Sequence, residues 1–429
     1  MTSKSPPVLD IYYRPEIWDE PILLRPNRGD LVEMAPGRRN SEHVKRAVAW
    51  LAAYGQAHSW QLQEVLGVSP TVLSRTMKPL FESGIVARGR PDLFGGGSMP
   101  YFFKLVNEAP LKKFLRDMPT QEWLAISGGT NVVTGKHLKH NVTMGEVAIR
   151  AMRDIPSIAC AFGEPFSAAE RLVPDCKSGA IGDATLVRDD GLRYVVELTS
   201  YSTEGLEAKV VRWAKVLMRG SVHDVGLVIV FLNAAPPARH RYMDKMLRRT
   251  IESALNPQNL VDQHTPFVSD STIQMLRDHI LLASFSDWVK EGMVFTPEFQ
   301  ALHARALGGD GKWGPVDAIG MPFNPADRHT WLAPIRQMGN LYCIPRFMFE
   351  DDSEDGGGVQ GESQPVEAAV PTGGDDAGPQ SGGAGVSEAG GFGLADLAAM
   401  GDDEEGAEEE AQERSSGGSF FDLGAIAKL

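Results

Sequence analysis

The composition of the chain changes abruptly after Phe349, and this break limits how much of the sequence can fold. From Glu350 to Leu429 the residues are mostly Gly, Ser, Ala, Pro, Asp and Glu, with 20 acidic side chains against only Arg414 and Lys428. Such a segment cannot bury enough apolar surface to offset its ordering entropy. We therefore predict a disordered acidic tail over residues 350–429, behind a folded body.

The body carries a small positive charge, although the whole chain has a formal net charge of −14. Before the tail there are 36 acidic and 40 basic residues. The cysteines at 160, 176 and 343 show no CxxC spacing, which indicates a reducing compartment and argues against a disulfide scaffold or a zinc cluster. No apolar run approaches the roughly 18 residues that span a bilayer, and no signal-peptide core is present. We expect a soluble, cytoplasmic protein with no membrane partner.

Residues 1–40 are rich in proline, and we expect an extended N-terminal arm there. Residues 41–106 then show the order of a winged helix-turn-helix, with three helices followed by a β-hairpin. The third helix has the clearest boundaries, because Ser69 is a good N-cap, Pro70 suits the first helical position and Gly84 suits the end. The glycine-rich stretch "DLFGGGSMP" predicts the tip of the wing.

A winged helix that binds duplex DNA places the polar residues early in its third helix against the bases. Arginines on the wing strand would contact phosphates, which adds affinity but little sequence information. The candidate DNA-binding residues are Ser69, Thr71, Ser74, Arg75, Lys78, Arg88 and Arg90. A winged helix used only for protein contacts is the alternative, and the basic wing favours DNA.

After a connector over residues 107–138, the pattern becomes that of a second, α/β domain over residues 139–349. A helix is followed by two strands joined at a tight Asp189-Asp190-Gly191 turn, a basic amphipathic helix and a continuous apolar strand. Further helices are predicted over 238–255 and 269–289, with residues 267–270 as a candidate edge strand. The predicted fold class is a multidomain α+β or α/β chain.

Two carboxylates in this domain lie at the ends of adjacent predicted strands. Asp183 precedes one strand and Glu197 ends the other, so both side chains can reach one divalent cation such as Mg²⁺. Lys209 on the following helix is a candidate for stabilising charge, because Thr199 occupies the strand position where such nucleases usually carry lysine. Glu146 is a possible third carboxylate, and Asp175 competes with Asp183 for the upstream role. Carboxylates at strand ends are common, so purely structural roles stay open. His137 and His140 have no third partner nearby, and we expect capping or packing roles for them.

The order of elements and several motifs over residues 41–300 resemble the replication-relaxation proteins of actinobacterial plasmids and integrative elements. The resemblance is carried by the winged-helix pattern and by "LKHNVTMGEV", "LVPD", "GDATLV" and "YVVELTSYSTEGLEAKVVRWAKVL". It implies a winged helix followed by a domain related to the PD-(D/E)XK nucleases. It also implies a role in plasmid replication, mobilisation or DNA relaxation. In that family a polar or acidic residue often replaces the strand lysine, and Thr199 is compatible with this habit.

The tail ends in an apolar cluster that a purely solubilising segment does not need. "SFFDLGAIAKL" can form a short amphipathic helix that docks in a groove of a partner, such as a replication or mobilisation protein. The candidate partner-binding residues are Phe420, Phe421, Leu423 and Ile426. The charge of the tail can also shield the basic body from non-specific DNA.

These patterns favour a DNA-binding protein of a plasmid or other mobile element, whose nuclease-like domain lacks robust activity. A Mg²⁺-dependent endonuclease using Asp183, Glu197 and Lys209 is the first alternative. A winged-helix transcriptional regulator is the second. The sequence predicts no other cofactor.

Overall fold

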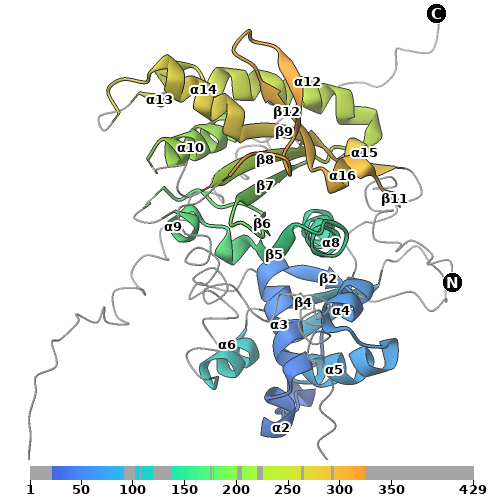
Figure 1. Ribbon diagram of the computed structural model, residues 1–429. Coiled ribbons are helices and arrows are strands. Elements are labelled where there is room, and N and C mark those ends of the chain that lie inside the picture. The colour runs from blue at the N-terminus through green and yellow to red at the C-terminus, as the bar shows by residue number, and fades with distance from the viewer. Residues whose placement is uncertain are drawn as a thin grey trace, which may run out of the picture. The chain divides into compact units, whose positions relative to one another are not determined.

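The described residues form a mixed α and β structure with one four-stranded, one seven-stranded and one two-stranded sheet (Figure 1). The structure is a computed structural model. The described residues are 22–90, 102–106, 108–118, 138–173, 176, 178–200, 205–219, 226–261, 265–290 and 294–323. The chain divides into two units after Gly358, and all described residues belong to the first. The tail predicted over residues 350–429 therefore lies outside them, as do residues 1–21 of the N-terminal arm.

The three helices and the hairpin predicted between residues 41 and 106 are present. They are α3 (Glu42–Tyr54), α4 (Ser59–Leu66), α5 (Pro70–Glu82), β3 (Val86–Arg90) and β4 (Phe102–Leu105). Gly67 ends α4 with a φ of 61°, in the left-handed region that glycine adopts without strain. Ser69 caps α5 by accepting a hydrogen bond from the Val72 amide at 3.4 Å.

Two further strands complete the small sheet, and the sequence patterns did not indicate either of them. β2 (Gln56–His58) lies between α3 and α4 and pairs with β4, while β1 (Ile22–Leu24) pairs with β3. The strand order is β1-β3-β4-β2. Part of the expected arm is thus an edge strand. Short strands of three residues carry too little alternation to be detected in a sequence.

The larger sheet has the order β13-β12-β9-β8-β7-β6-β5, with parallel strands only at its centre. β7 to β9 are parallel, and the outer pairs are antiparallel. The strands are β5 (Ile158–Gly163), β6 (Ala184–Arg188), β7 (Arg193–Thr199), β8 (Leu227–Asn233), β9 (Ile280–Ser284), β12 (His303–Leu307) and β13 (Trp313–Asp317). The predicted turn Asp189-Asp190-Gly191 joins β6 to β7, and Gly191 has a φ of 97°.

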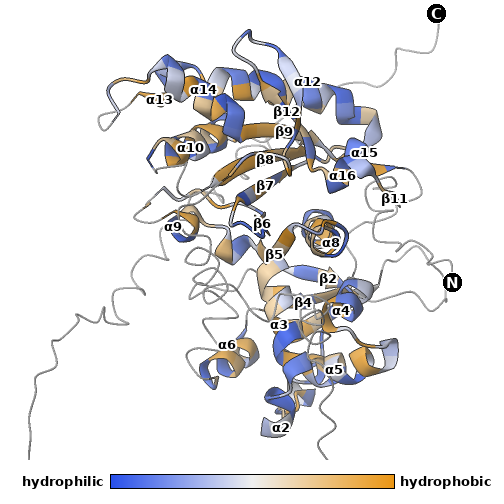
Figure 2. Cartoon of the chain, viewed as in Figure 1, coloured by the Kyte–Doolittle hydropathy of each residue, from blue (hydrophilic) through white to orange (hydrophobic). Residues whose placement is uncertain are grey.

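Helices cover both faces of this sheet and create a large apolar core on each (Figures 1 and 2). α8 (Leu138–Asp154) lies on one face; α10 (Leu206–Arg219), α12 (Pro237–Ala254) and α14 (Asp270–His279) lie on the other. The short elements are η3 (Arg28–Asp30), α2 (Pro36–Arg39), α6 (Ala109–Arg116), η4 (Glu164–Phe166), α9 (Ala169–Leu172), α13 (Pro257–Leu260), α15 (Phe285–Trp288), β10 (Val289–Lys290), β11 (Val294–Phe295) and α16 (Pro297–Gln300). Among the helices that the structure describes, none is both long and apolar enough to cross a membrane.

The single helix predicted over residues 269–289 is interrupted by a strand. α14 ends at His279, residues 280–284 form strand β9, and residues 285–288 form the separate short helix α15. The apolar run "ILLAS" is buried on both faces of the sheet, so its sequence lacks the alternation that marks a half-buried strand. Residues 267–270 form no edge strand, because Ser269 caps α14 instead.

His58 lies where the N-terminal elements meet α8, and it is fully buried. Its Nδ1 accepts a hydrogen bond from the Trp60 amide and caps α4. Gln61 accepts from the His58 amide and donates to the carbonyl of Val142 on α8 at 2.8 Å. Burial lowers the pKa of His58 to about 3, because a charged imidazole would lose its hydration.

We predict that His58 makes stability depend on pH in mildly acidic solution. The neutral form is favoured in the folded state, so the stability it contributes is complete above the unfolded pKa of 6.5 and falls as the pH drops towards 3. Between about pH 7.5 and 5, the free energy of unfolding should fall by about 2 kcal/mol more in the wild type than in His58→Asn. Urea denaturation of both proteins at the two pH values measures this difference. Equal losses in both proteins would contradict the assignment.

Candidate functional site

Asp183 and Glu197 face each other across the β6–β7 pair. Ala184 pairs with Val196 in the antiparallel register, so the preceding residue Asp183 lies opposite Glu197. The Asp183 amide donates to the Val196 carbonyl at 3.0 Å, which extends the pairing by one residue. Residues directly opposite on one sheet face have close Cβ atoms. The structure therefore brings together the two carboxylates that the sequence singled out.

Glu197 is held by two side chains from one face of α10. Lys209 places its Nζ 2.5 Å from Oε2 of Glu197, and Trp213 donates its indole N–H to Oε1 at 2.6 Å. Lysine and tryptophan are four residues apart, which puts them on the same side of a helix. The carboxylate is only 1% exposed. Burial, with the nearby Asp183 charge, raises the pKa of Glu197 above its usual value, although Lys209 and Trp213 stabilise its charged form.

Asp183 has partners on two other elements. Its Oδ1 lies 3.0 Å from Nε2 of His140 at the start of α8, and its Oδ2 accepts from the Leu198 amide at 2.6 Å. Burial opposes the charged carboxylate, but His140, Lys209 and the Leu198 N–H outweigh it and hold the pKa of Asp183 below its usual value. The Asp183 carboxylate correspondingly raises the pKa of His140 against the effect of burial. Asp183 and His140 thus form a second ion pair beside the first.

A further carboxylate, that of Glu164, lies close enough for the charge of Asp183 to shift its pKa. Burial and the Asp183 charge raise the pKa of Glu164, in η4 after β5. Glu146, the possible third carboxylate of the sequence analysis, is bound by other residues. Its side chain accepts hydrogen bonds from Arg150 at 2.9 Å and from Gln61. Burial raises the pKa of Glu146 to about 7. Asp175 and His137 lie outside the described residues.

Sequence reasoning missed three members of this cluster: His140, Glu164 and Trp213. His140 was expected to cap or pack, and its partner is a carboxylate more than 40 residues away in the sequence. Glu164 follows β5, a strand that the patterns did not indicate. Only Trp213 carried a usable signal, because it lies one turn beyond Lys209 on a predicted helix.

All four carboxylate oxygens of Asp183 and Glu197 have protein partners. Mg²⁺ binds through carboxylate oxygens and keeps several waters in near-octahedral geometry. Within the residues that the structure describes, no group of three or more His, Cys, Asp or Glu side chains is arranged to hold a metal ion. Thr199, on the same strand face as Glu197, adds no charge. The donors suit Mg²⁺ in type, but this arrangement does not fit the ion unless His140 and Lys209 release the carboxylates.

The DNA-binding residues predicted on α5 share one exposed helix face. At 100° per residue, Thr71, Ser74, Arg75 and Lys78 span an arc of about 100°, and all four are exposed. Ser69 at the N-cap is exposed as well. Lys78 lies 3.6 Å from Glu82, so one acidic group borders this face.

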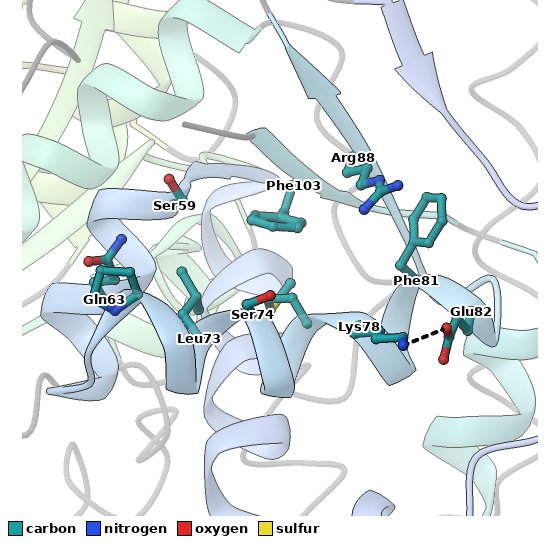
Figure 3. Close-up of a pocket in the computed structure, with 11 residues that line it drawn as sticks. Ser59, Gln63, Leu73, Ser74, Lys78, Phe81, Glu82, Arg88 and Phe103 are labelled. Carbon is teal, nitrogen blue, oxygen red and sulfur yellow. Dashed lines mark ion pairs between the residues drawn. The ribbon is translucent and has the colours of Figure 1, made fainter. Parts of the chain in front are cut away.

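A hollow of about 410 Å³ lies between α5 and the hairpin strands (Figure 3). Ser74 and Lys78 line it from α5, and Phe103 lines it from β4. The Arg88 guanidinium lies 4.2 Å from the centre of the Phe81 ring, a cation–π contact. Arg88 therefore packs in this hollow beside α5. The side chain of Arg90 lies outside the described residues, as do Phe420, Phe421, Leu423 and Ile426 of the tail.

No protein-family model matches the chain, and neither the curated proteins nor the solved structures searched include a significant match. The resemblance to the replication-relaxation family therefore stays a prediction.

We predict that Lys209→Met destabilises the protein increasingly as the pH rises. Without the ammonium, the folded-state pKa of Glu197 should rise further, and an acid with a raised pKa loses stability between its unfolded and folded values. Breaking a fully buried ion pair costs about 3–5 kcal/mol. Lys209 is 34% exposed, so water would replace part of the interaction, and we expect about 1–3 kcal/mol at pH 8. Urea denaturation at about pH 5.5 and 8 measures the effect.

Glu197→Gln combined with Lys209→Met is the matched control, since it removes both charges and keeps the Trp213 partner. The double variant should show little of this pH dependence. A Lys209→Met penalty that is the same at both pH values, or unchanged in the double variant, would contradict the pairing.

Proposed function

We propose that this protein binds duplex DNA through α5 and acts in the replication, mobilisation or relaxation of a plasmid or other mobile element. The observation that carries the proposal is the exposed polar and cationic face of α5, formed by Thr71, Ser74, Arg75 and Lys78. Hydroxyl and cationic groups on one helix face suit base edges and phosphates in a major groove. The sequence resemblance supports the mobile-element part of the proposal, and the expected compartment is the cytoplasm.

The order of elements around α5 supports a winged helix-turn-helix. α4 and α5 are joined by three residues, with Gly67 providing the left-handed turn. β2, which precedes α4, forms an antiparallel sheet with β3 and β4, which follow α5. In such modules the second helix of the pair enters the major groove. The sequence indicated that Arg88 contacts phosphates. Its guanidinium instead packs on the Phe81 ring beside the hollow, so we do not propose Arg88 as a main phosphate contact.

The second domain supports a proposal of a nuclease-like fold used for binding. In the run α8, β5, β6, β7, α10, β8, Asp183 immediately precedes β6 and lies opposite Glu197 on β7, and this arrangement supports the proposal of a PD-(D/E)XK-like fold. Lys209 reaches Glu197 from α10 in place of a strand lysine. Because His140, Lys209, Trp213 and the Leu198 amide occupy every carboxylate oxygen, we propose that this domain lacks robust cleavage activity.

A Mg²⁺-dependent endonuclease is the alternative that a specific observation favours. Asp183, Glu197 and Lys209 are the residue types that this chemistry needs, and all three lie in one cluster. The pKa values of Asp183 and Glu197 are shifted in opposite directions, and paired groups with separated pKa values often mark functional sites.

The acidic tail is the third part of the proposal. Its 20 acidic residues against 2 basic ones complement the mildly basic body. We propose that it limits non-specific DNA binding through its charge and recruits a replication or mobilisation protein through the apolar cluster at its end.

We predict that Arg75→Gln with Lys78→Gln weakens DNA binding. Each lost phosphate contact should reduce the slope of log affinity against log salt concentration by about 0.9. The slope of the double variant should therefore be smaller than that of the wild type by up to about 2. Fluorescence anisotropy with a short labelled duplex of mixed sequence, titrated at several salt concentrations, measures the affinity and this slope. Lys112→Gln with Arg116→Gln on α6 is the control of equal charge, since both residues are exposed. Equal effects of the two variants would refute a specific role of α5.

We predict that supercoiled plasmid incubated with the full-length protein stays intact in EDTA, Mg²⁺ or Mn²⁺, while its gel mobility is retarded. The physical reason is that the carboxylate oxygens already have protein partners. Glu197→Ala is run beside the wild type. Metal-dependent nicking that disappears in Glu197→Ala would establish the endonuclease and overturn our preferred function.

A further inference from the structure

The outer face of α12 carries a row of cations that the proposed function does not yet use. Arg241, Lys245 and Arg249 follow one another at four-residue intervals, and all three are exposed. Tyr242 lies beside them with 68% of its surface exposed. At 100° per residue these four side chains fall within an arc of about 100°. We name Arg241, Tyr242, Lys245 and Arg249 the α12 stripe.

The charges of the α12 stripe are available to a ligand. Within the described residues none of its three cations takes part in an ion pair, whereas their neighbour Arg248 pairs with Asp244 at 3.0 Å. Asp244 is engaged by Arg305 as well. The remaining acidic residue of the helix, Glu252, accepts from the indole of Trp313 at 2.7 Å. Both acidic side chains of α12 thus contact residues outside the α12 stripe, so they do not neutralise its three cations.

Packing explains why this row faces solvent. The buried residues of α12 are Met243, Leu247, Ile251 and Ala254, which recur at helical spacing and cover the sheet. The four residues of the stripe lie on the opposite side of the helix from these buried positions. Its charges are therefore not required by the fold, since an exposed helix face of any polar composition would serve.

A regular row of cations fits a ligand with regularly spaced anions. Successive cations are separated by about 6 Å along the helix axis, a spacing comparable to that of neighbouring phosphates on one nucleic-acid strand. Arginine, lysine and tyrosine side chains all donate hydrogen bonds to phosphate oxygens. Contacts from these side chains to phosphate oxygens carry no sequence information, so binding of this kind would be independent of the base sequence.

We propose that the α12 stripe is a second DNA-binding surface that contacts the phosphate backbone of the duplex. This inference rests on the proposed DNA binding of the protein, and it adds a contact outside α5. The stripe supplies affinity and salt dependence, while α5 supplies any sequence preference.

The test compares full-length wild type with Arg241→Gln, Lys245→Gln and Arg249→Gln combined. A labelled duplex of mixed sequence is titrated by fluorescence anisotropy between about 50 and 200 mM salt. If the stripe contacts three phosphates, the triple variant should reduce the salt slope by about 2 to 3. The charge-matched control is Lys112→Gln, Lys113→Gln and Arg116→Gln on α6, all exposed, and it should leave the slope nearly unchanged. Circular dichroism checks that both triple variants remain folded.

Running the α5 double variant Arg75→Gln/Lys78→Gln in the same series separates the two ideas. A stripe variant that binds like the wild type, while the α5 variant binds worse, overturns the inference and leaves the proposed function standing. If instead the stripe variant binds worse and the α5 variant binds like the wild type, the stripe is supported and the proposed role of α5 in DNA binding is wrong. Equal losses in the stripe and control triple variants also overturn the inference, because total charge alone would explain them. If the wild type does not bind duplex even at low salt, both the inference and the proposed function are wrong.

Discussion

Helix α3 packs against two sets of partners, and the arrangement of the described residues depends on this double packing. Ten of its thirteen residues, from Val44 to Tyr54, are buried. One core cluster runs from α3 and α5 through α8 to the central strands of the large sheet. A Cβ atom on Gly163, at the end of β5, would lie 2.3 Å from the Ala53 carbonyl oxygen. Only glycine lets β5 approach α3 this closely. The N-terminal helices therefore share a core cluster with the α/β sheet.

The parts of this fold that were predictable from sequence are those whose local pattern and tertiary environment agree. Ser69, Pro70 and the apolar period fixed α5, and the glycine at 191 fixed the β6–β7 turn. Prediction failed where tertiary packing decides the structure. The run "ILLAS" continues the apolar pattern of α14, and only burial between two helical layers makes it strand β9. β2 is three residues long and exists because β4 pairs with it.

The candidate site shows the same division. Asp183 and Glu197 were predictable because strand ends in a hairpin must meet, and Lys209 because the following helix must return over the sheet. The contact of His140 with Asp183 joins residues more than 40 positions apart, which no local pattern encodes. A buried ion pair is weak evidence for a stabilising role, because a protein with apolar residues of similar volume in its place is often at least as stable. Under the proposed function, a role in binding or cleavage explains the two adjacent ion pairs around the facing carboxylates.

Charge then connects the candidate surfaces with the tail. Under the proposed function, DNA that reaches α5 or the α12 stripe competes with a tail holding 20 acidic residues. The tail is covalently attached, so its effective concentration does not fall on dilution, whereas that of DNA does. Contacts made only to phosphates are the ones that such a competitor displaces most readily, because both depend on the same cations. Base contacts are added only at the correct sequence and are not offered by the tail. A tethered polyanion would therefore lower non-specific DNA binding more than specific DNA binding. The acidic tail and the basic surfaces together would increase the preference for the specific site at the expense of the total affinity for DNA.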